Sequence, residues 1–238
     1  MDQKKLDQQS QHWEASFSSK PEMFGLEPSE AAIQAKKIFE EQPVTTFLAR
    51  KKIDILELGA GLGRDTTYLA AESRFIHVTA LDYSAEAIKI INKKKIEWYS
   101  DPTGADGKPI SDRINAKVWD VRDKLPFKDN SFDGCFSHML YCMALTTSDL
   151  LKLNKEICRV LKPGGINIYT ARNTDDGDYK NGTHIGEDLY KNDGFIVHYF
   201  SEEKVKQLSN GFENLTIEKF EEGSFPRKLF FVINKKII

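Results

Sequence analysis

Cysteine, long apolar runs and an excess of positive charge are all scarce in this sequence. Only three cysteines occur in 238 residues, without a C-x-x-C pair and without a histidine at the spacing of a zinc site. Small secreted scaffolds depend on many paired cysteines, so this usage argues against a disulfide framework and against a metal site. We expect reduced, buried thiols in a cytoplasmic protein, at Cys135, Cys142 and Cys158.

No segment approaches the about 20 apolar residues of a membrane-spanning helix, and the first residues, MDQKKLDQQSQHW, lack the apolar core of a signal peptide. The net charge is −2, from 34 basic and 36 acidic side chains. Binding to a phosphate backbone needs a strong basic field, which this balance does not supply. We therefore expect neither a nucleic acid nor a membrane as a partner.

The composition that remains is that of an ordinary globular domain, with 40% hydrophobic and 29% charged residues. A chain of this length suffices for one α/β domain with a sizeable core, or for such a domain with a small lid. Composition therefore limits the architecture without indicating a function.

The most informative stretch is IDILELGAGLGRD, which runs from Ile53 to Asp65. Its β-branched, apolar start predicts a buried strand over 53–58, and residues 65–71 predict a helix. Between them, the loop Gly59-Ala60-Gly61-Leu62-Gly63 lets the backbone turn tightly and approach a ligand. The N–H groups at the start of the helix then face polar or anionic atoms. The three parts together predict a ligand-binding cradle, although an ordinary tight turn has the same pattern.

The spacing of the glycines separates two ligand classes. The dinucleotide fingerprint is G-x-G-x-x-G, whereas here the third glycine comes one residue early and Arg64 holds the dinucleotide position. Glu57 would repel a pyrophosphate but suits a ligand with an ammonium or sulfonium charge. The pattern E-x-G-x-G-x-G, at Glu57, Gly59, Gly61 and Gly63, resembles the first motif of class I S-adenosylmethionine-dependent methyltransferases. An NAD(P)-linked oxidoreductase fits the fold, but it fits neither this spacing nor the glutamate.

Acidic residues follow the next two predicted strands. Asp82 ends the second strand, about 20 residues beyond the glycine loop, where a carboxylate accepts hydrogen bonds from ribose hydroxyls. Tyr83 then lies where its ring can pack on adenine. Asp120 and Val121 follow the third strand, and the resemblance implies that they bind the amino group and the ring of adenine. The alternatives are that Asp82 only caps a helix and that Asp120 is a turn acid.

The fourth strand, expected around 132–136, leads into Ser137 and His138, beside the expected position of the methyl group. The preceding pattern L-P-F…S-F-D also resembles the methyltransferase family. We assign Ser137, with Ala60 of the loop, to the cofactor site. His138 is the best candidate for a general base if the acceptor is a hydroxyl or an amine, although a lone histidine is more often structural. An acceptor that is already ionised needs no base.

The two ends of the chain flank this region. Residues 1–44 form an N-terminal arm and helix, in which FGLEPS resembles the arm of methyltransferases of the tellurite-resistance and thiopurine group. We interpret residues 1–28 either as a loose arm or as a lid over the glycine loop. Residues 45–238 form the S-adenosylmethionine-binding domain, in which 172–198 is a long polar excursion on the substrate side.

Strands and helices alternate up to residue 171, and a helix and two strands follow. This order predicts an α/β fold with a doubly wound, mostly parallel, seven-stranded Rossmann-like sheet, an antiparallel closing edge and helices on both faces. Ligands of such sheets bind at the carboxyl ends of the strands. The remaining expected elements are helices at 29–43, 85–99, 148–161 and 201–210, loops at 101–112 and 162–165, and strands at 76–81, 115–119, 166–171, 215–221 and 228–234.

The resemblance implies an S-adenosylmethionine-dependent methyltransferase that acts on a small-molecule acceptor, with S-adenosyl-L-methionine as its cofactor. The alternative is a regulatory module of the same fold that binds this cofactor without transferring the methyl group. The acceptor atom (oxygen, nitrogen, sulfur or carbon) and the oligomeric state stay open, because substrate-binding residues of such a fold come from lids and insertions.

Overall fold

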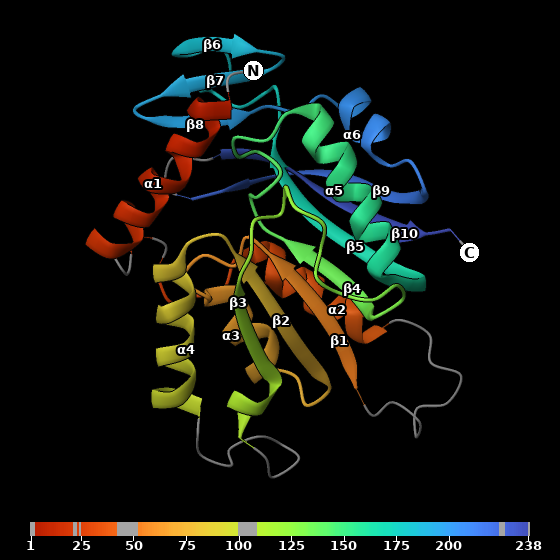
Figure 1. The fold of residues 1–238 in the computed structure, drawn as a ribbon. Helices are drawn as coiled ribbons and strands as arrows, with labels where there is room; N and C mark the ends of the chain where they lie inside the picture. The colour runs from red at the N-terminus through yellow and green to blue at the C-terminus, as the bar shows by residue number, and fades with distance from the viewer. Residues whose placement is uncertain are drawn as a thin grey trace.

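A computed structural model of the chain describes residues 3–20, 23, 25–41, 52–99, 109–223 and 227–237. Its centre is a seven-stranded sheet with the strand order β3-β2-β1-β4-β5-β10-β9 (Figure 1). Neighbouring strands are parallel from β3 to β5, and β10 is antiparallel to both β5 and β9. The predicted doubly wound sheet with an antiparallel edge is therefore confirmed. The strands are β1 (Ile53–Leu58), β2 (Ile76–Asp82), β3 (Ile114–Val118), β4 (Phe132–Ser137), β5 (Leu161–Arg172), β9 (Phe212–Glu222) and β10 (Arg227–Lys236).

The register brings the carboxyl ends of the parallel strands to one edge of the sheet. Glu57 of β1 pairs with Ala80 of β2 on one side and with Phe136 of β4 on the other. Asp82 of β2 pairs with Val118 of β3. The chain order reverses between β1 and β4, and ligands of doubly wound sheets bind at such a switch point.

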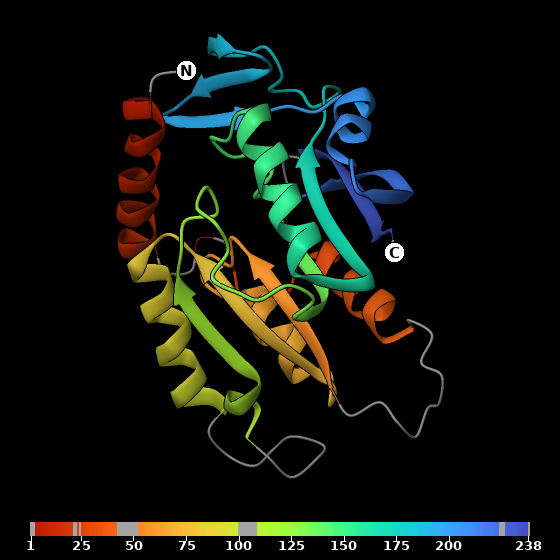
Figure 2. The ribbon, with the colours of Figure 1, turned by 45° about the vertical axis from the view of Figure 1, so that its right-hand side comes forward.

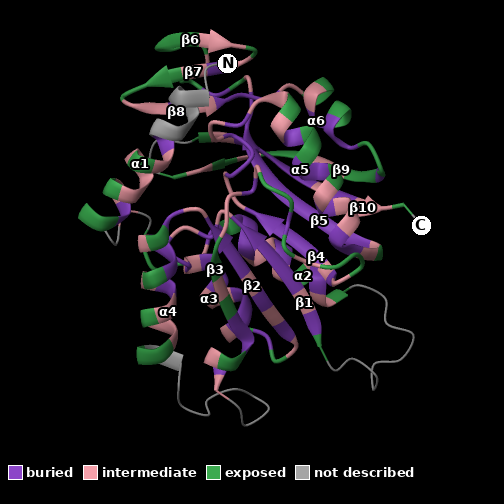
Figure 3. Cartoon of the chain, viewed as in Figure 1, coloured by how far each residue is buried: buried purple, intermediate pink, exposed green. Residues whose placement is uncertain are grey.

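Two apolar cores cover the two faces of the sheet, with α5 in front of the strands in Figure 2 and α2 and α3 behind them. Ile55 packs into the core under α2, α3 and α4, and Leu56 into the core under α5, because successive strand side chains point to opposite faces. Both side chains are fully buried. Figure 3 shows β1 as a mostly buried strand, which agrees with its mostly apolar sequence, IDILEL. The helices are α2 (Glu30–Glu41), α3 (Arg64–Ala71), α4 (Ala85–Tyr99), α5 (Thr147–Val160) and α6 (Glu202–Leu208).

The junction between α5 and β5 differs from the prediction. The loop expected at 162–165 is part of β5, which begins at Leu161 directly after the helix. Leu161 is fully buried and pairs with Phe132, so the chain re-enters the sheet at once. The register shifts between Phe132 and Gly134, and the additional residues form an irregularity within the strand.

Two further parts of the fold were not predicted. Residues Gln3–Ser19 form a long helix, α1, where the sequence indicated an arm. The polar excursion contains a separate antiparallel sheet, which we call the cap sheet, of strands β6 (Thr183–Gly186), β7 (Leu189–Asn192) and β8 (Phe195–His198). In Figure 1, α1 extends from the cap sheet towards α4, and it contacts both.

Some expectations fall outside the described residues: the helix end at Pro43, the boundary at 44/45, Phe24 of the FGLEPS pattern and residues 101–108 of the expected loop. The rest of that loop contains a short 3-10 helix, η2 (Ile110–Arg113). In the part of the chain that is described, no helix combines the length and apolarity needed to cross a bilayer.

A buried histidine joins the cap sheet to the rest of the protein. The Nδ1 atom of His198, which is fully buried, lies 2.8 Å from the Leu145 carbonyl oxygen, and its Nε2 lies 2.6 Å from Lys204 Nζ. A carbonyl only accepts, so Nδ1 carries the hydrogen and Nε2 accepts from the lysine. The backbone N–H of His198 donates to the Cys142 carbonyl at 2.9 Å. A neutral imidazole thus holds the cap sheet against the loop that follows β4.

This contact should make stability depend on acidity. Burial, and then the neighbouring Lys204, lower the pKa of His198 to about 4. An unfolded histidine titrates near pH 6.5, so between these values the unfolded chain binds a proton that the folded chain does not, and acid favours unfolding. Between pH 7 and pH 4, the wild type should lose about 3 kcal/mol more unfolding free energy than His198→Gln loses. Urea unfolding at both pH values measures this, and a constant difference would contradict it.

Candidate functional site

The glycine loop has a conformation that glycine adopts without strain. Gly59 and Gly63 have φ angles of 71° and 78°, in the left-handed region. A Cβ atom on Gly59 would lie 3.0 Å from the Leu140 side chain, and one on Gly63 would lie 2.6 Å from Ile91 of α4. Ala60 closes the turn, because its carbonyl accepts the Gly63 N–H at 3.0 Å. These positions therefore permit both the turn and the close packing around it.

Glu57 lies buried at the end of β1, with 3% of its surface exposed. Its Oε2 accepts a hydrogen bond from the Thr66 hydroxyl at 2.5 Å. Burial, and then the nearby carboxylate of Asp65, raise the pKa of Glu57 well above its usual value. Asp65 accepts from the N–H and the hydroxyl of Ser29, at 2.7 and 2.8 Å, which ties α2 to α3. A buried carboxylate next to another carboxylate is stabilised most by a cationic ligand.

Asp82 connects the glycine loop to the end of β2. Its Oδ2 accepts the Gly61 N–H at 2.8 Å and its Oδ1 accepts the Ser84 N–H at 2.9 Å. Burial raises the pKa of Asp82 to about 6, although the two N–H groups act in the opposite direction. Each oxygen has further lone-pair capacity for a ligand. Asp82 also fixes the turn at Ser84 that begins α4, so the alternative role of a capping acid is present as well.

Asp120 is held by Arg122, which the sequence analysis did not select as a site residue. Its Oδ1 accepts from the Arg122 N–H at 2.9 Å and from Nε at 3.0 Å, and its Oδ2 accepts from Nη2 at 2.5 Å. Burial would raise the pKa of Asp120, but these hydrogen bonds outweigh it and lower the pKa. The carboxylate that the resemblance assigns to adenine is thus bound to arginine in this structure.

A pocket with about 420 Å³ of empty space, open to solvent, lies at the carboxyl ends of β2 and β3. Three predicted site residues line it, namely Tyr83, Asp120 and Val121. One helix, α1, supplies a further wall, and the loop after β4 supplies another. The remaining lining residues are Gln9, Ser10, Trp13, Arg122, Leu140, Met143, Ala144 and Leu145.

The other predicted site residues are not among those lining this pocket: Glu57, Gly59, Ala60, Gly61, Gly63 and Asp82 of the loop and strand ends, and Ser137 and His138 at the end of β4. Ser137 is fully buried, and its hydroxyl has no hydrogen-bond partner among the described residues. The ring of His138 lies between two side chains, with Nδ1 3.0 Å from Thr170 Oγ1 and Nε2 3.0 Å from Glu222 Oε2. Glu222 comes from the closing strands, and no sequence signal connects it with β4.

The N-terminal helix is fastened on two sides of the pocket. The side-chain amide of Gln9 pairs with the backbone near β8, donating to the Gly194 carbonyl at 2.7 Å and accepting the Ile196 N–H at 3.1 Å. The carboxylate of Glu14 accepts from the Ser84 hydroxyl and from a backbone N–H in the first turn of α4. These contacts connect α1 to both the cap sheet and the turn that follows Asp82.

Residues 56–169 match the family described as "Methyltransferase domain". The matched segment includes the glycine loop, Asp82, Asp120 and the end of β4. This segment therefore has the sequence pattern and the doubly wound fold of a class I, S-adenosylmethionine-dependent methyltransferase domain.

Squalene methyltransferase 1 of Botryococcus braunii is 31% identical over 177 residues, which cover 73% of this chain and 41% of that protein. The 24-methylenesterol C-methyltransferase 2 of Arabidopsis thaliana is 28% identical over 158 residues, 66% of this chain and 38% of that protein. The chain therefore spans about two fifths of the length of these relatives.

Among solved structures, the 1,6-didemethyltoxoflavin-N1-methyltransferase of Burkholderia thailandensis, with bound 1,6-didemethyltoxoflavin and S-adenosylhomocysteine, has the same fold. The TM-score is 0.67 at 16% identity, over 98% of this chain and 88% of the other.

Proposed function

We propose that this protein binds S-adenosylmethionine and transfers its methyl group to a small molecule. The observation that carries the proposal is the buried carboxylate of Asp82, which holds the glycine loop beside a pocket lined by Tyr83 and Val121. This arrangement places acceptors for ribose next to a partly apolar pocket that can receive a base.

The residues present suit this cofactor. The two oxygens of Asp82 have lone pairs for two ribose hydroxyls, and Glu57 with the glycine loop suits the cationic methionine end. Asp120 remains our proposed partner of the adenine amino group, which requires Arg122 to give up at least one hydrogen bond. The bound cofactor supplies a methyl group already activated on a sulfonium, so the protein has to orient the acceptor and exclude water.

We infer a small-molecule acceptor because the net charge of −2 lacks a basic field for nucleic acid, and because the similar proteins are named for squalene and sterol acceptors. We also propose a cytoplasmic location, which the three free cysteines favour. The test is formation of S-adenosylhomocysteine with a panel of amines, alcohols, thiols and alkenes. Turnover that depends on an acceptor supports the proposal, whereas cofactor binding without turnover on any of them favours the regulatory alternative.

We further propose that, of the N-terminal segment 1–44, the arm of residues 1–28 acts as a lid on the domain formed by 45–238, whereas α2 is part of the core. Phe17 of α1 is 4% exposed, and its ring lies 3.8 Å from the position of a Cβ on Gly61. Trp13 lines the pocket from the same helix. Because α1 covers both the loop and the pocket, the cofactor would enter when this helix moves.

Trp13→Ala is expected to weaken S-adenosylhomocysteine binding about tenfold, chiefly through faster dissociation, because a large apolar wall of the pocket is lost. Stopped-flow fluorescence and calorimetry measure the rate and the affinity. Trp13→Phe keeps an aromatic wall and serves as the matched control. Equal dissociation rates for all three proteins would argue against the lid.

A further inference from the structure

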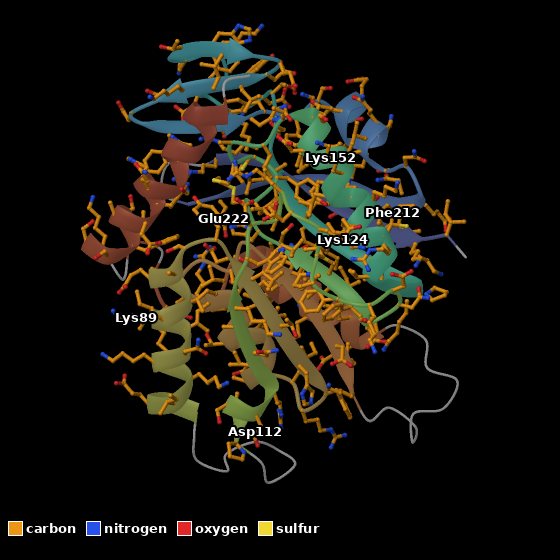
Figure 4. The ribbon with its side chains drawn as sticks, in the orientation of Figure 1. Lys89, Asp112, Lys124, Lys152, Phe212 and Glu222 are labelled. Carbon is orange, nitrogen blue, oxygen red and sulfur yellow. The ribbon has the colours of Figure 1, made fainter. Side chains whose placement is uncertain are left out.

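Three side chains, two from strands and one from the residue after a strand, meet at the carboxyl-end edge of the sheet. His138 follows β4, Thr170 lies near the end of β5, and Glu222 ends β9. The imidazole bridges the other two, with 3.0 Å from Nδ1 to Thr170 Oγ1 and 3.0 Å from Nε2 to Glu222 Oε2. Figure 4 labels Glu222 between α1 and the ends of the parallel strands.

The hydrogens of this group can be assigned from its chemistry. Burial would raise the pKa of Glu222, but the hydrogen bond from His138 outweighs it and lowers the pKa, so the carboxylate is ionised and only accepts. Nε2 of His138 therefore carries a hydrogen. Nδ1 then has a lone pair that accepts the hydrogen of the Thr170 hydroxyl, while Thr170 Oγ1 itself accepts the Met139 N–H at 2.8 Å. In the neutral ring, both nitrogens are then occupied, and no lone pair is left to take a proton from an acceptor.

The cluster of three side chains is connected to the wall of the pocket through Met139 and Leu140, the two residues that follow His138. Met139 has a φ of 63°, a left-handed conformation that a residue with a side chain adopts only when its surroundings hold it. Its N–H is the one bound by Thr170. Leu140, which follows, lines the pocket and packs directly over Gly59. The position of this wall thus depends on the turn that the three side chains support.

We propose that Glu222 is a positioning residue, which acts through His138 and Thr170 to hold the Met139–Leu140 turn against the glycine loop. Within this arrangement His138 is a structural donor and acceptor and not the general base. The inference about the pocket rests on the proposed function, whereas the inference about the hydrogen bonds does not.

The neighbours of Glu222 define suitable variants. Besides His138, the carboxylate receives the backbone N–H of Glu30 at the start of α2, and the charge of Arg64 lies nearby. Glu222→Gln retains an oxygen that accepts from Nε2–H, whereas Glu222→Ala removes it. Glu221→Ala is the matched control, since this exposed glutamate precedes Glu222 on the same strand.

The first test observes the ring directly, by long-range ¹H–¹⁵N correlation of histidine-labelled full-length protein, with the His138 signals assigned from His138→Gln. In the neutral form of the ring, we expect the Nε2–H tautomer in the wild type and Glu221→Ala, and loss of this single tautomer in Glu222→Ala. An Nδ1–H tautomer in the wild type, or an unchanged spectrum in Glu222→Ala, would overturn the proposal.

The second test measures the pocket, by calorimetric titration with S-adenosylhomocysteine. We expect Glu222→Ala to bind S-adenosylhomocysteine roughly tenfold more weakly than the wild type. Glu222→Gln and His138→Gln should keep most of the wild-type affinity, because their amide groups can replace these hydrogen bonds. Equal affinity for the wild type and Glu222→Ala would overturn the positioning role. A wild type that does not bind this ligand would instead contradict the proposed function, and the tautomer result would still decide the hydrogen bonding.

Discussion

Asp82→Ala is expected to weaken the binding of S-adenosylmethionine by about a hundredfold or more. A hydrogen bond to a charged group contributes about 1.5–3 kcal/mol, and the substitution removes the acceptor of two ribose hydroxyls. It also releases the N–H groups of Gly61 and Ser84, which Asp82 holds at 2.8 and 2.9 Å, so the glycine loop loses its connection to β2. Isothermal titration calorimetry measures the effect.

Asp82→Asn is the matched control, because asparagine has the same shape and keeps one acceptor oxygen. Its affinity for S-adenosylmethionine should fall between those of the wild type and Asp82→Ala. Burial raises the pKa of Asp82 to about 6 in the free protein, and only the ionised carboxylate accepts from two hydroxyls. Acidification below pH 6 should therefore weaken binding more steeply in the wild type than in Asp82→Asn, in which only the raised pKa of Glu57 still makes binding depend on pH. Unchanged affinity in Asp82→Ala would remove the ribose assignment.

Gly63→Ala is expected to lower the unfolding free energy by about 3 kcal/mol. The left-handed φ of 78° disfavours alanine, and the new Cβ would lie 2.6 Å from Ile91 Cγ1, which is fully buried and has little room to move. Because Gly63 directly precedes α3, the strain falls on the glycine loop, which we propose to bind the cofactor. Urea unfolding of the free protein measures the loss.

Gly177→Ala serves as the comparison, because no atom lies within 4 Å of its added Cβ. Its unfolding free energy should remain within about 0.5 kcal/mol of the wild-type value. Equal stability of Gly63→Ala and Gly177→Ala would show that the turn accommodates alanine without strain, and would contradict the requirement for glycine at position 63.

The central sheet and the glycine loop were predictable because their signals are local. A buried parallel strand reads as a continuous apolar run, and the loop reads as glycines at fixed spacing. The same holds for Asp82, whose distance from the loop follows from one helix and one strand. Spacing of this kind depends on neighbouring residues alone, so a single sequence reveals it.

Long-range partners were not predictable in this way. Glu222 meets His138 only because β9 and β10 close the sheet beside β5, and nothing in the sequence near Glu222 marks it. The strands of the cap sheet have four residues each, which is too short for a clear alternating pattern. Helix α1 was not predicted because its first residues are polar. Its apolar residues Trp13 and Phe17 are covered by tertiary contacts, which the local sequence does not indicate.

Calorimetric titration of the full chain with S-adenosylmethionine, and in parallel with NADH, tests the central claim most directly. The arrangement of Glu57, the glycine loop and Asp82 predicts binding of S-adenosylmethionine in the micromolar range and no binding of NADH. Failure to bind S-adenosylmethionine, or preferential binding of NADH, would contradict the account of this pocket as the cofactor site of a methyltransferase.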